Sequence, residues 1–187
     1  EPDPSRGIFA ELAHEFALRE VGSAFSFNKT FLHLKAYQRL LPSVLGKVVL
    51  AGRAGLGYIG GASVPFYEYR DQWASEGSIG SLGGAATLRG YKQGRFAAPW
   101  SAFASLELRV RLAQFRAIWQ HFAVGVLPFV DVGTVADDFE GVTALANFRH
   151  SQGVGLRLAW NVNTILRLDW AFSKEDSQLF LKLGHSF

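Results

Sequence analysis

Hydrophobic and polar residues alternate with a period of two along most of the chain. In the clearest stretch, Leu106 and Leu108 alternate with Glu107 and Arg109. This period is typical of a β-strand with one apolar and one polar face. Equivalent patterns predict eight strands, over residues 6–19, 25–41, 47–58, 101–112, 116–135, 148–160, 164–173 and 177–187. The content of Ala, Glu and Leu in the first of these stretches is also compatible with a helix.

A long segment without a sustained period separates the third predicted strand from the fourth, at about residues 59–99. Segments of this length inside a domain are usually functional or disordered. This one contains Phe66, Tyr67, Tyr69 and Trp73, so we expect it to be ordered. The other connections are short turns at one set of strand ends and longer ones at the other set.

Two kinds of all-β protein fit eight strands that each have one apolar face. A soluble lipocalin-like barrel or sandwich must cover its outside with charge, yet only 19% of the residues are charged. This favours an antiparallel transmembrane β-barrel with a polar interior, and the soluble fold is the alternative. Aromatic residues near the predicted strand ends fit the two membrane interfaces. They are Tyr58, Trp100, Trp119, Trp160 and Trp170.

Length and composition narrow the possible functions. We expect residues 1–187 to form a single domain. The chain has no cysteine, which excludes a disulfide framework and thiolate chemistry. Its net charge is only +3 and its basic residues are scattered, so we expect no nucleic-acid partner. The longest apolar run, at residues 122–130, is too short for a membrane-spanning helix.

The most unusual stretch of the chain is residues 82–96. Its glycines at positions 83, 84, 90 and 94 permit a tight backbone. Arg89 follows Leu88 and precedes Gly90 and Tyr91, which suggests a guanidinium directed at a partner within the protein. The alternative is a flexible hairpin loop with a solvated arginine.

The run Gly83-Gly84 through Leu88-Arg89-Gly90-Tyr91 resembles the loop motif of the BamA/TamA-type outer-membrane assembly and translocation superfamily, the bacterial surface antigen barrels. Three further segments are similar to that superfamily, in the right order. They are Leu106-Glu107-Leu108-Arg109, Phe129-Val130-Asp131-Val132-Gly133, and the end of the chain from Gly153 to Phe187. The resemblance corresponds to the last eight strands of a sixteen-stranded barrel, without POTRA repeats.

The resemblance implies both a structure and a role. The long loop would fold back into the barrel, where Arg89 would pair with Glu107 and Asp131 on the inner wall. Leu183 and Phe187 would belong to the C-terminal signal for barrel insertion. The chain would be an integral protein of the outer membrane of a Gram-negative bacterium, without a cofactor. It would insert or translocate unfolded outer-membrane or secreted proteins; the alternative is a small pore or structural barrel without assembly activity.

An eight-stranded barrel has room only for its own side chains, so it cannot also hold a long loop. An open sheet in lipid would leave unpaired edges, which a bilayer does not tolerate. Three arrangements avoid both problems: two chains that share one sixteen-stranded barrel, a dimer with the loops outside two small barrels, or a chain that is part of a longer protein. We expect self-association as a homodimer.

Enzymatic chemistry has little support in the sequence. Neither a metal-binding spacing nor a nucleophile elbow occurs. Ser105, His121 and Asp131 share the polar face, as a hydrolase or acyltransferase would require. His121 and Asp131, however, are about 33 Å apart along one strand. We therefore expect no enzyme and no metal site, and an interior lattice of paired charges. Its members are Glu11, Glu15, Arg53, Arg109, Arg111, Arg157, Arg167, Asp169 and Lys182.

Overall fold

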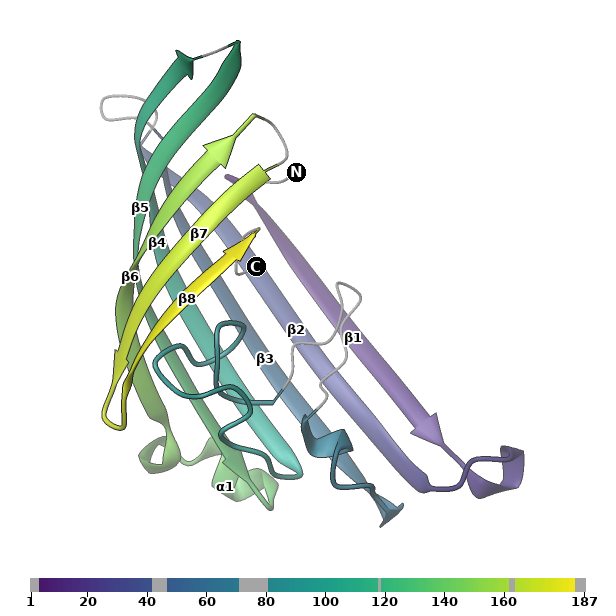
Figure 1. Ribbon diagram of the computed structural model, residues 1–187. Coiled ribbons are helices and arrows are strands. Elements are labelled where there is room, and N and C mark those ends of the chain that lie inside the picture. The colour runs from purple at the N-terminus through teal and green to yellow at the C-terminus, as the bar shows by residue number, and fades with distance from the viewer. Residues whose placement is uncertain (1–3, 42–46, 71–80, 118, 162–163, 184–187) are drawn as a thin grey trace.

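The computed structural model describes residues 4–41, 47–70, 81–117, 119–161 and 164–183. In this part of the chain, eight strands form one antiparallel sheet in sequence order (Figure 1). The strands are β1 (Gly7–Ala17), β2 (Ser26–Leu41), β3 (Val48–Ser63), β4 (Trp100–Ala117), β5 (Gln120–Ala136), β6 (Arg149–Trp160), β7 (Thr164–Ser173) and β8 (Ser177–Leu183). The predictions of an all-β fold, eight strands and a long segment after the third strand are confirmed.

Short helices occupy some of the connections. They are η1 (Arg19–Val21), η2 (Glu68–Arg70), α1 (Phe139–Thr143) and η3 (Leu145–Asn147). None of the helices in the described residues is long and apolar enough to cross a membrane. The three longest connections, which follow β1, β3 and β5, lie at the same end of the sheet (Figure 1).

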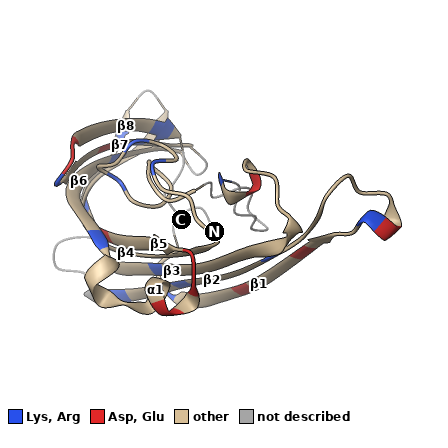
Figure 2. Ribbon diagram, turned by 90° about the horizontal axis from the view of Figure 1, so that it is seen from below, with Lys and Arg blue, Asp and Glu red and all other residues tan. Residues whose placement is uncertain are grey.

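The sheet is strongly curved, and its curvature increases from β1 toward β8. Viewed from the end with the longer connections, β1–β3 are rather flat, whereas β5–β8 bend over the segment that follows β3 (Figure 2). Among the described residues, β1 pairs only with β2 and β8 only with β7. The predicted closure into a barrel is therefore not seen, and the long segment lies against the concave face of an open sheet.

The two faces of the sheet differ in polarity. Leu106, Leu156 and Leu181 lie on the convex face, where each is at least half exposed. Glu107 and Asp131, by contrast, are completely buried on the concave face. A soluble barrel has the opposite arrangement, because it buries its apolar face. The convex face therefore suits a lipid environment, and the concave face suits a polar lumen.

Three boundaries in the described residues differ from the prediction by more than two residues. β3 continues to Ser63, because residues 59–63 still pair with β2, so the long segment begins at residue 64 rather than 59. β4 extends to Ala117 and β5 begins at Gln120, where the sequence pattern suggested residues 112 and 116. Trp119 falls within the predicted strand of residues 116–135. It instead lies in the turn between these strands with a φ of 62°.

Candidate functional site

Residues 81–96 form a compact segment inside the curve of the sheet, which we call the plug segment. Leu82 and Phe96 form an isolated β-bridge at its base, closed by a 3.0 Å hydrogen bond from the Phe96 amide to the Leu82 carbonyl. The amide of Gly84 donates to the carbonyls of Leu88 and Tyr91 at 3.2 and 3.1 Å. The backbone thus folds back on itself, and the Leu88–Tyr91 turn points toward the sheet.

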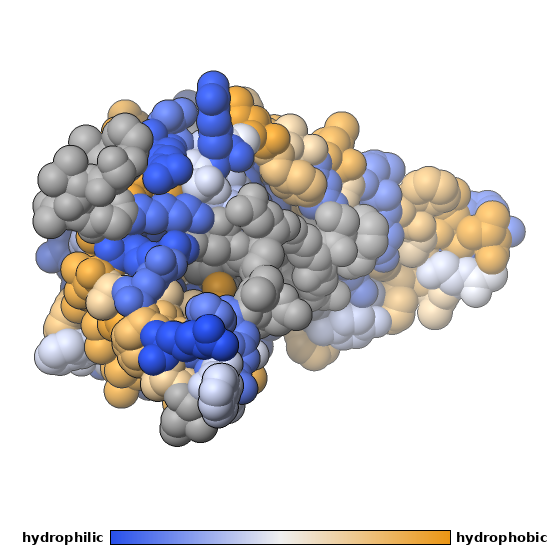
Figure 3. All heavy atoms as spheres, turned by 90° about the horizontal axis from the view of Figure 1, so that it is seen from above, coloured by the Kyte–Doolittle hydropathy of each residue, from blue (hydrophilic) through white to orange (hydrophobic). Residues whose placement is uncertain are grey.

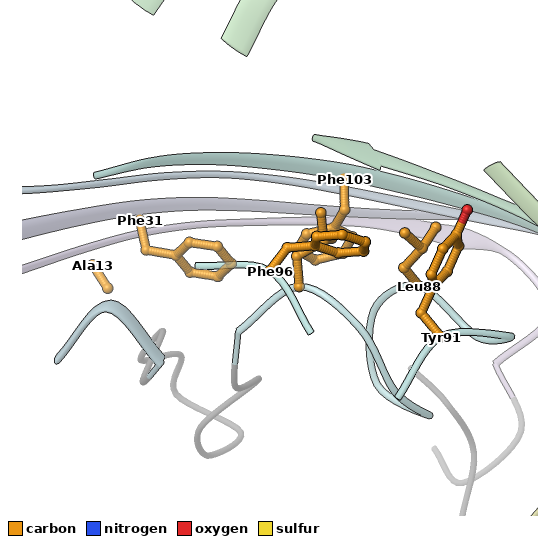
Figure 4. Packing of buried hydrophobic residues seen from close by; sticks show 7 residues of the cluster. Ala13, Phe31, Leu88, Tyr91, Phe96 and Phe103 are labelled. Carbon is orange, nitrogen blue, oxygen red and sulfur yellow. The ribbon is translucent and has the colours of Figure 1, made fainter. Parts of the chain in front are cut away.

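An apolar cluster fastens one side of the plug segment to the sheet. Phe31 of β2 and Phe103 of β4 point from the sheet toward the plug segment, whereas Leu88, Tyr91 and Phe96 point back toward them (Figure 4). All five side chains are at least nine-tenths buried. Burial of large apolar side chains contributes roughly 1.5–3 kcal/mol each. The plug segment is therefore a packed part of the fold.

Arg89 makes the central polar contact of the plug segment. Its Nε and Nη2 atoms donate to the two carboxylate oxygens of Asp131 at 2.8 and 2.7 Å, and its backbone amide donates to the same carboxylate at 3.1 Å. Its Nη1 atom donates to Glu107 at 2.8 Å. The guanidinium also lies 3.5 Å from the centre of the Phe129 ring. The structure thus brings Arg89 together with both acids named from the sequence.

A third carboxylate, which the sequence assigned only to the interior charge lattice, also contacts Arg89. Asp169 of β7 accepts a 3.4 Å hydrogen bond from Nη1 of Arg89. The same carboxylate accepts hydrogen bonds from Arg157 and Arg167, both at 2.5 Å. Asp169 lies 80 residues from Arg89, and its position on the polar face of a strand was the only signal that could have identified it.

Side chains of the sheet also bind the backbone of the plug segment. Arg53 donates to the Ala86 carbonyl, and Arg167 donates to the Ala85 carbonyl at 2.9 Å. The hydroxyl of Ser173 donates to the Gly90 carbonyl at 2.8 Å. These donors come from β3 and β7, so contacts from both sides of the curved sheet fix the plug segment.

Gly90, directly after Arg89, is required by its position. Its φ is +91°, which side-chain-bearing residues rarely adopt. A Cβ atom there would lie 3.0 Å from the backbone of Phe172 and 3.1 Å from the Cβ of Ser151. Gly83 and Gly84 of the predicted motif also have positive φ angles. The glycines therefore let the backbone approach β6 and β7 closely enough for Arg89 to reach its acids.

The electrostatics of this site keep Arg89 charged. Burial by itself lowers the pKa of Arg89, but the carboxylate of Asp131 and then those of Glu107 and Asp169 raise it above its usual value. Each of these three carboxylates is completely buried. Loss of one partner from a buried ion pair typically costs about 3–5 kcal/mol. Arg89 and the three acids therefore depend on one another.

The other residues named from the sequence lie elsewhere. Leu183 ends β8 and is exposed, and Phe187 lies outside the described residues. Ser105 pairs across the strands with Asp131, but both Asp131 oxygens are bound by Arg89. His121 lies at the start of β5, away from that pair. In the described part of the chain, no group of three or more His, Cys, Asp or Glu side chains is arranged so that it could hold a metal ion.

Comparison with protein families identifies an Omp85 superfamily domain over residues 1–187. The matched range includes all eight strands and the plug segment, and no POTRA repeat lies within it. The superfamily predicted from the sequence motifs is thereby confirmed. Comparison with curated proteins finds no match.

We predict that Gly153→Ala destabilises the protein, because it disturbs the Phe129 ring on which the Arg89 guanidinium stacks. A Cβ at Gly153 would lie 2.2 Å from the Trp170 carbonyl and 2.5 Å from the Phe129 ring, so either the backbone or the ring must move. The expected loss is about 1–3 kcal/mol in the free energy of unfolding, measured by urea titration in detergent micelles.

Gly52→Ala is the matched control, because a Cβ there would meet only ordinary contacts at 3.7 and 3.9 Å. Its free energy of unfolding should stay within about 1 kcal/mol of the unchanged protein or rise slightly. Equal effects of the two substitutions would show that the space beside Phe129 does not matter.

Proposed function

The chain belongs to the Omp85 superfamily, and on this basis we propose that it inserts or translocates proteins at the outer membrane of a Gram-negative bacterium. Residues 1–187 would form one domain whose convex face contacts lipid. Its partners would be unfolded outer-membrane or secreted proteins. The exposed leucines of the convex face and the buried charges of the concave face support this environment.

The observation that carries the proposal is the burial of Arg89 among Glu107, Asp131 and Asp169. These acids lie on β4, β5 and β7, so one guanidinium links three strands to the plug segment. We propose that this link holds the plug segment in the lumen and sets how far the curved sheet can open. The role is mechanical and requires neither a catalytic group nor a cofactor.

In the described sheet, β1 and β8 are the two edge strands, so a closed barrel requires a pairing partner for each of them. Each presents backbone groups that a lipid environment would leave unsatisfied. We propose that further strands complete the barrel, supplied by a second copy of this chain as a homodimer. Strands of the same polypeptide beyond these residues are the alternative source. A seam between such edges is the natural place for lateral opening toward the membrane.

We predict that Arg89→Ala lowers the assembly of a barrel substrate by about tenfold or more, because it removes the guanidinium that joins the plug segment to Asp131. The measurement is the rate at which the purified protein, reconstituted in vesicles, inserts an unfolded outer-membrane protein. Circular dichroism establishes that the variant retains its strands.

Arg95→Ala is the control, because Arg95 belongs to the same plug segment but is half exposed and pairs with Glu175 at the surface. It should leave the rate unchanged. If Arg89→Ala keeps its strands and the full rate, the plug segment has no part in assembly. If the unchanged protein shows no assembly at all, the proposed function is wrong, and the alternative of a small pore or structural barrel takes its place.

We predict that the membrane-embedded unit contains two chains. After the detergent contribution is subtracted, its mass should be twice the chain mass of 20.6 kDa, because the described residues of one chain leave both edges of the sheet unpaired. Light scattering with detergent subtraction measures this mass. A single-chain mass in a stable, folded preparation would rule out the homodimer.

A further inference from the structure

A cavity of about 480 Å³ lies at the opposite end of the sheet from α1, near the turn between β4 and β5. Residues of β3, β4, β5, β6 and β7 line it. Its volume falls within the range of known ligand-binding cavities. It is separate from the site around Arg89, although two arginines, Arg109 and Arg157, contribute to both.

The charged residues that line this cavity are all basic or titratable to a cation. They are Lys47, Arg109, Arg111, His121 and Arg157. No aspartate or glutamate is among its described lining residues. Viewed from this end of the sheet, hydrophilic residues gather over the curved part of the molecule (Figure 3). The cavity therefore favours an anion.

The positions of the buried acids on the concave face explain why the charged residues of the cavity are basic. Among the described residues of the sheet, four buried arginines, at positions 53, 109, 157 and 167, share the concave face with three buried carboxylates, at positions 107, 131 and 169. All three carboxylates lie on the Arg89 side, where Arg89 binds each of them. The cationic side chains of the cavity consequently lie beyond the last acid of the wall.

Arg157 provides a second, independent observation. Its Nη1 atom binds Asp169, but among the described residues its buried Nε and Nη2 atoms have no hydrogen-bond partner. The Nε and Nη2 atoms of Arg89 both donate hydrogen bonds to the carboxylate of Asp131. Those of Arg109 both donate to the carboxylate of Glu107. On the same concave face, the group that accepts hydrogen bonds from this pair of arginine nitrogens is therefore a carboxylate.

The apolar part of the lining indicates what would carry the carboxylate. Val49, Leu127 and Ile165 are buried residues of the concave face between the cationic side chains. An extended peptide that alternates acidic and apolar side chains would match both sets. A membrane lipid is disfavoured because the apolar surface that suits lipid is on the convex face.

We propose that this cavity binds an acidic, extended segment of a polypeptide through Lys47, Arg111 and Arg157. The inference rests on the proposed function, because the substrate protein would supply that segment. The cations would hold the substrate on the concave face, near the turn between β4 and β5 and apart from the lipid-facing surface. Arg109 adds positive charge, although its fork already binds Glu107.

The test measures peptide binding to the full chain in phosphatidylcholine nanodiscs by fluorescence anisotropy. The probe is a dye-labelled octapeptide of alternating Val and Glu, compared with its Val and Gln counterpart. The Glu peptide should bind about tenfold more tightly or better, because each charge-assisted contact is lost in the Gln peptide. Equal affinity of the two peptides would overturn the proposal.

The combined variant Lys47→Gln and Arg111→Gln should lose the preference for the Glu peptide. Lys174→Gln is the charge-matched control, because Lys174 lies exposed in the β7–β8 turn at the other end of the sheet. A preference that survives in the combined variant would overturn the proposal. If the combined variant does not fold, the two single variants and Arg157→Lys give the same comparison.

Short-chain phosphatidylglycerol separates lipid headgroups from peptide. If it displaces the Glu peptide from the unchanged protein, the cations bind lipid phosphates and the proposal is wrong. Binding is measured at equilibrium without an assembly step, so failure of the proposed function leaves this result readable. Conversely, assembly that depends on Arg89 without any preference for the Glu peptide would overturn only the cavity proposal.

Discussion

The contact between the Arg89 guanidinium and three buried carboxylates is the constraint on which the concave face depends. Glu107, Asp131 and Asp169 lie on three different strands, and their buried carboxylates meet at one cation that contacts all of them. The plug segment provides that cation. Its glycines permit the close approach, and its apolar residues pack against β2 and β4. Sheet curvature, strand register and loop conformation therefore support one another.

The same contact organises the charges of the wall. Arg89 contacts all three acids, and Lys47, Arg111 and His121 line the cavity near the turn between β4 and β5. The alternating pattern of the strands leaves the convex face apolar and places the charges on the concave face, where the plug segment packs. The open edges of β1 and β8 complete this picture, since they are where additional strands can pair and separate.

Much of the fold could be predicted because a strand's period of two is visible locally. Glu107 and Asp131 could be placed on the polar face for the same reason, and the Arg89 motif suggested their partner through the family resemblance. Asp169 could not be assigned to Arg89, because that contact depends on how far the sheet curls over the plug segment. Residues 59–63 lack a sustained period and were predicted to belong to the long segment, yet β3 continues through them beside β2. Closure of the sheet into a barrel depends on what pairs with the edges of β1 and β8, and the alternation of residues within a strand does not specify this.

The central claim is that Arg89 and Asp131 are energetically coupled. The most direct measurement is a double-mutant cycle on the free energy of unfolding, with Arg89→Ala, Asp131→Ala and the combination. The account predicts a coupling energy of at least about 2 kcal/mol, because removal of Arg89 leaves fewer buried charges uncompensated when Asp131 is absent too. A coupling energy near zero would mean that the plug segment is held by its apolar contacts alone, and would contradict the account.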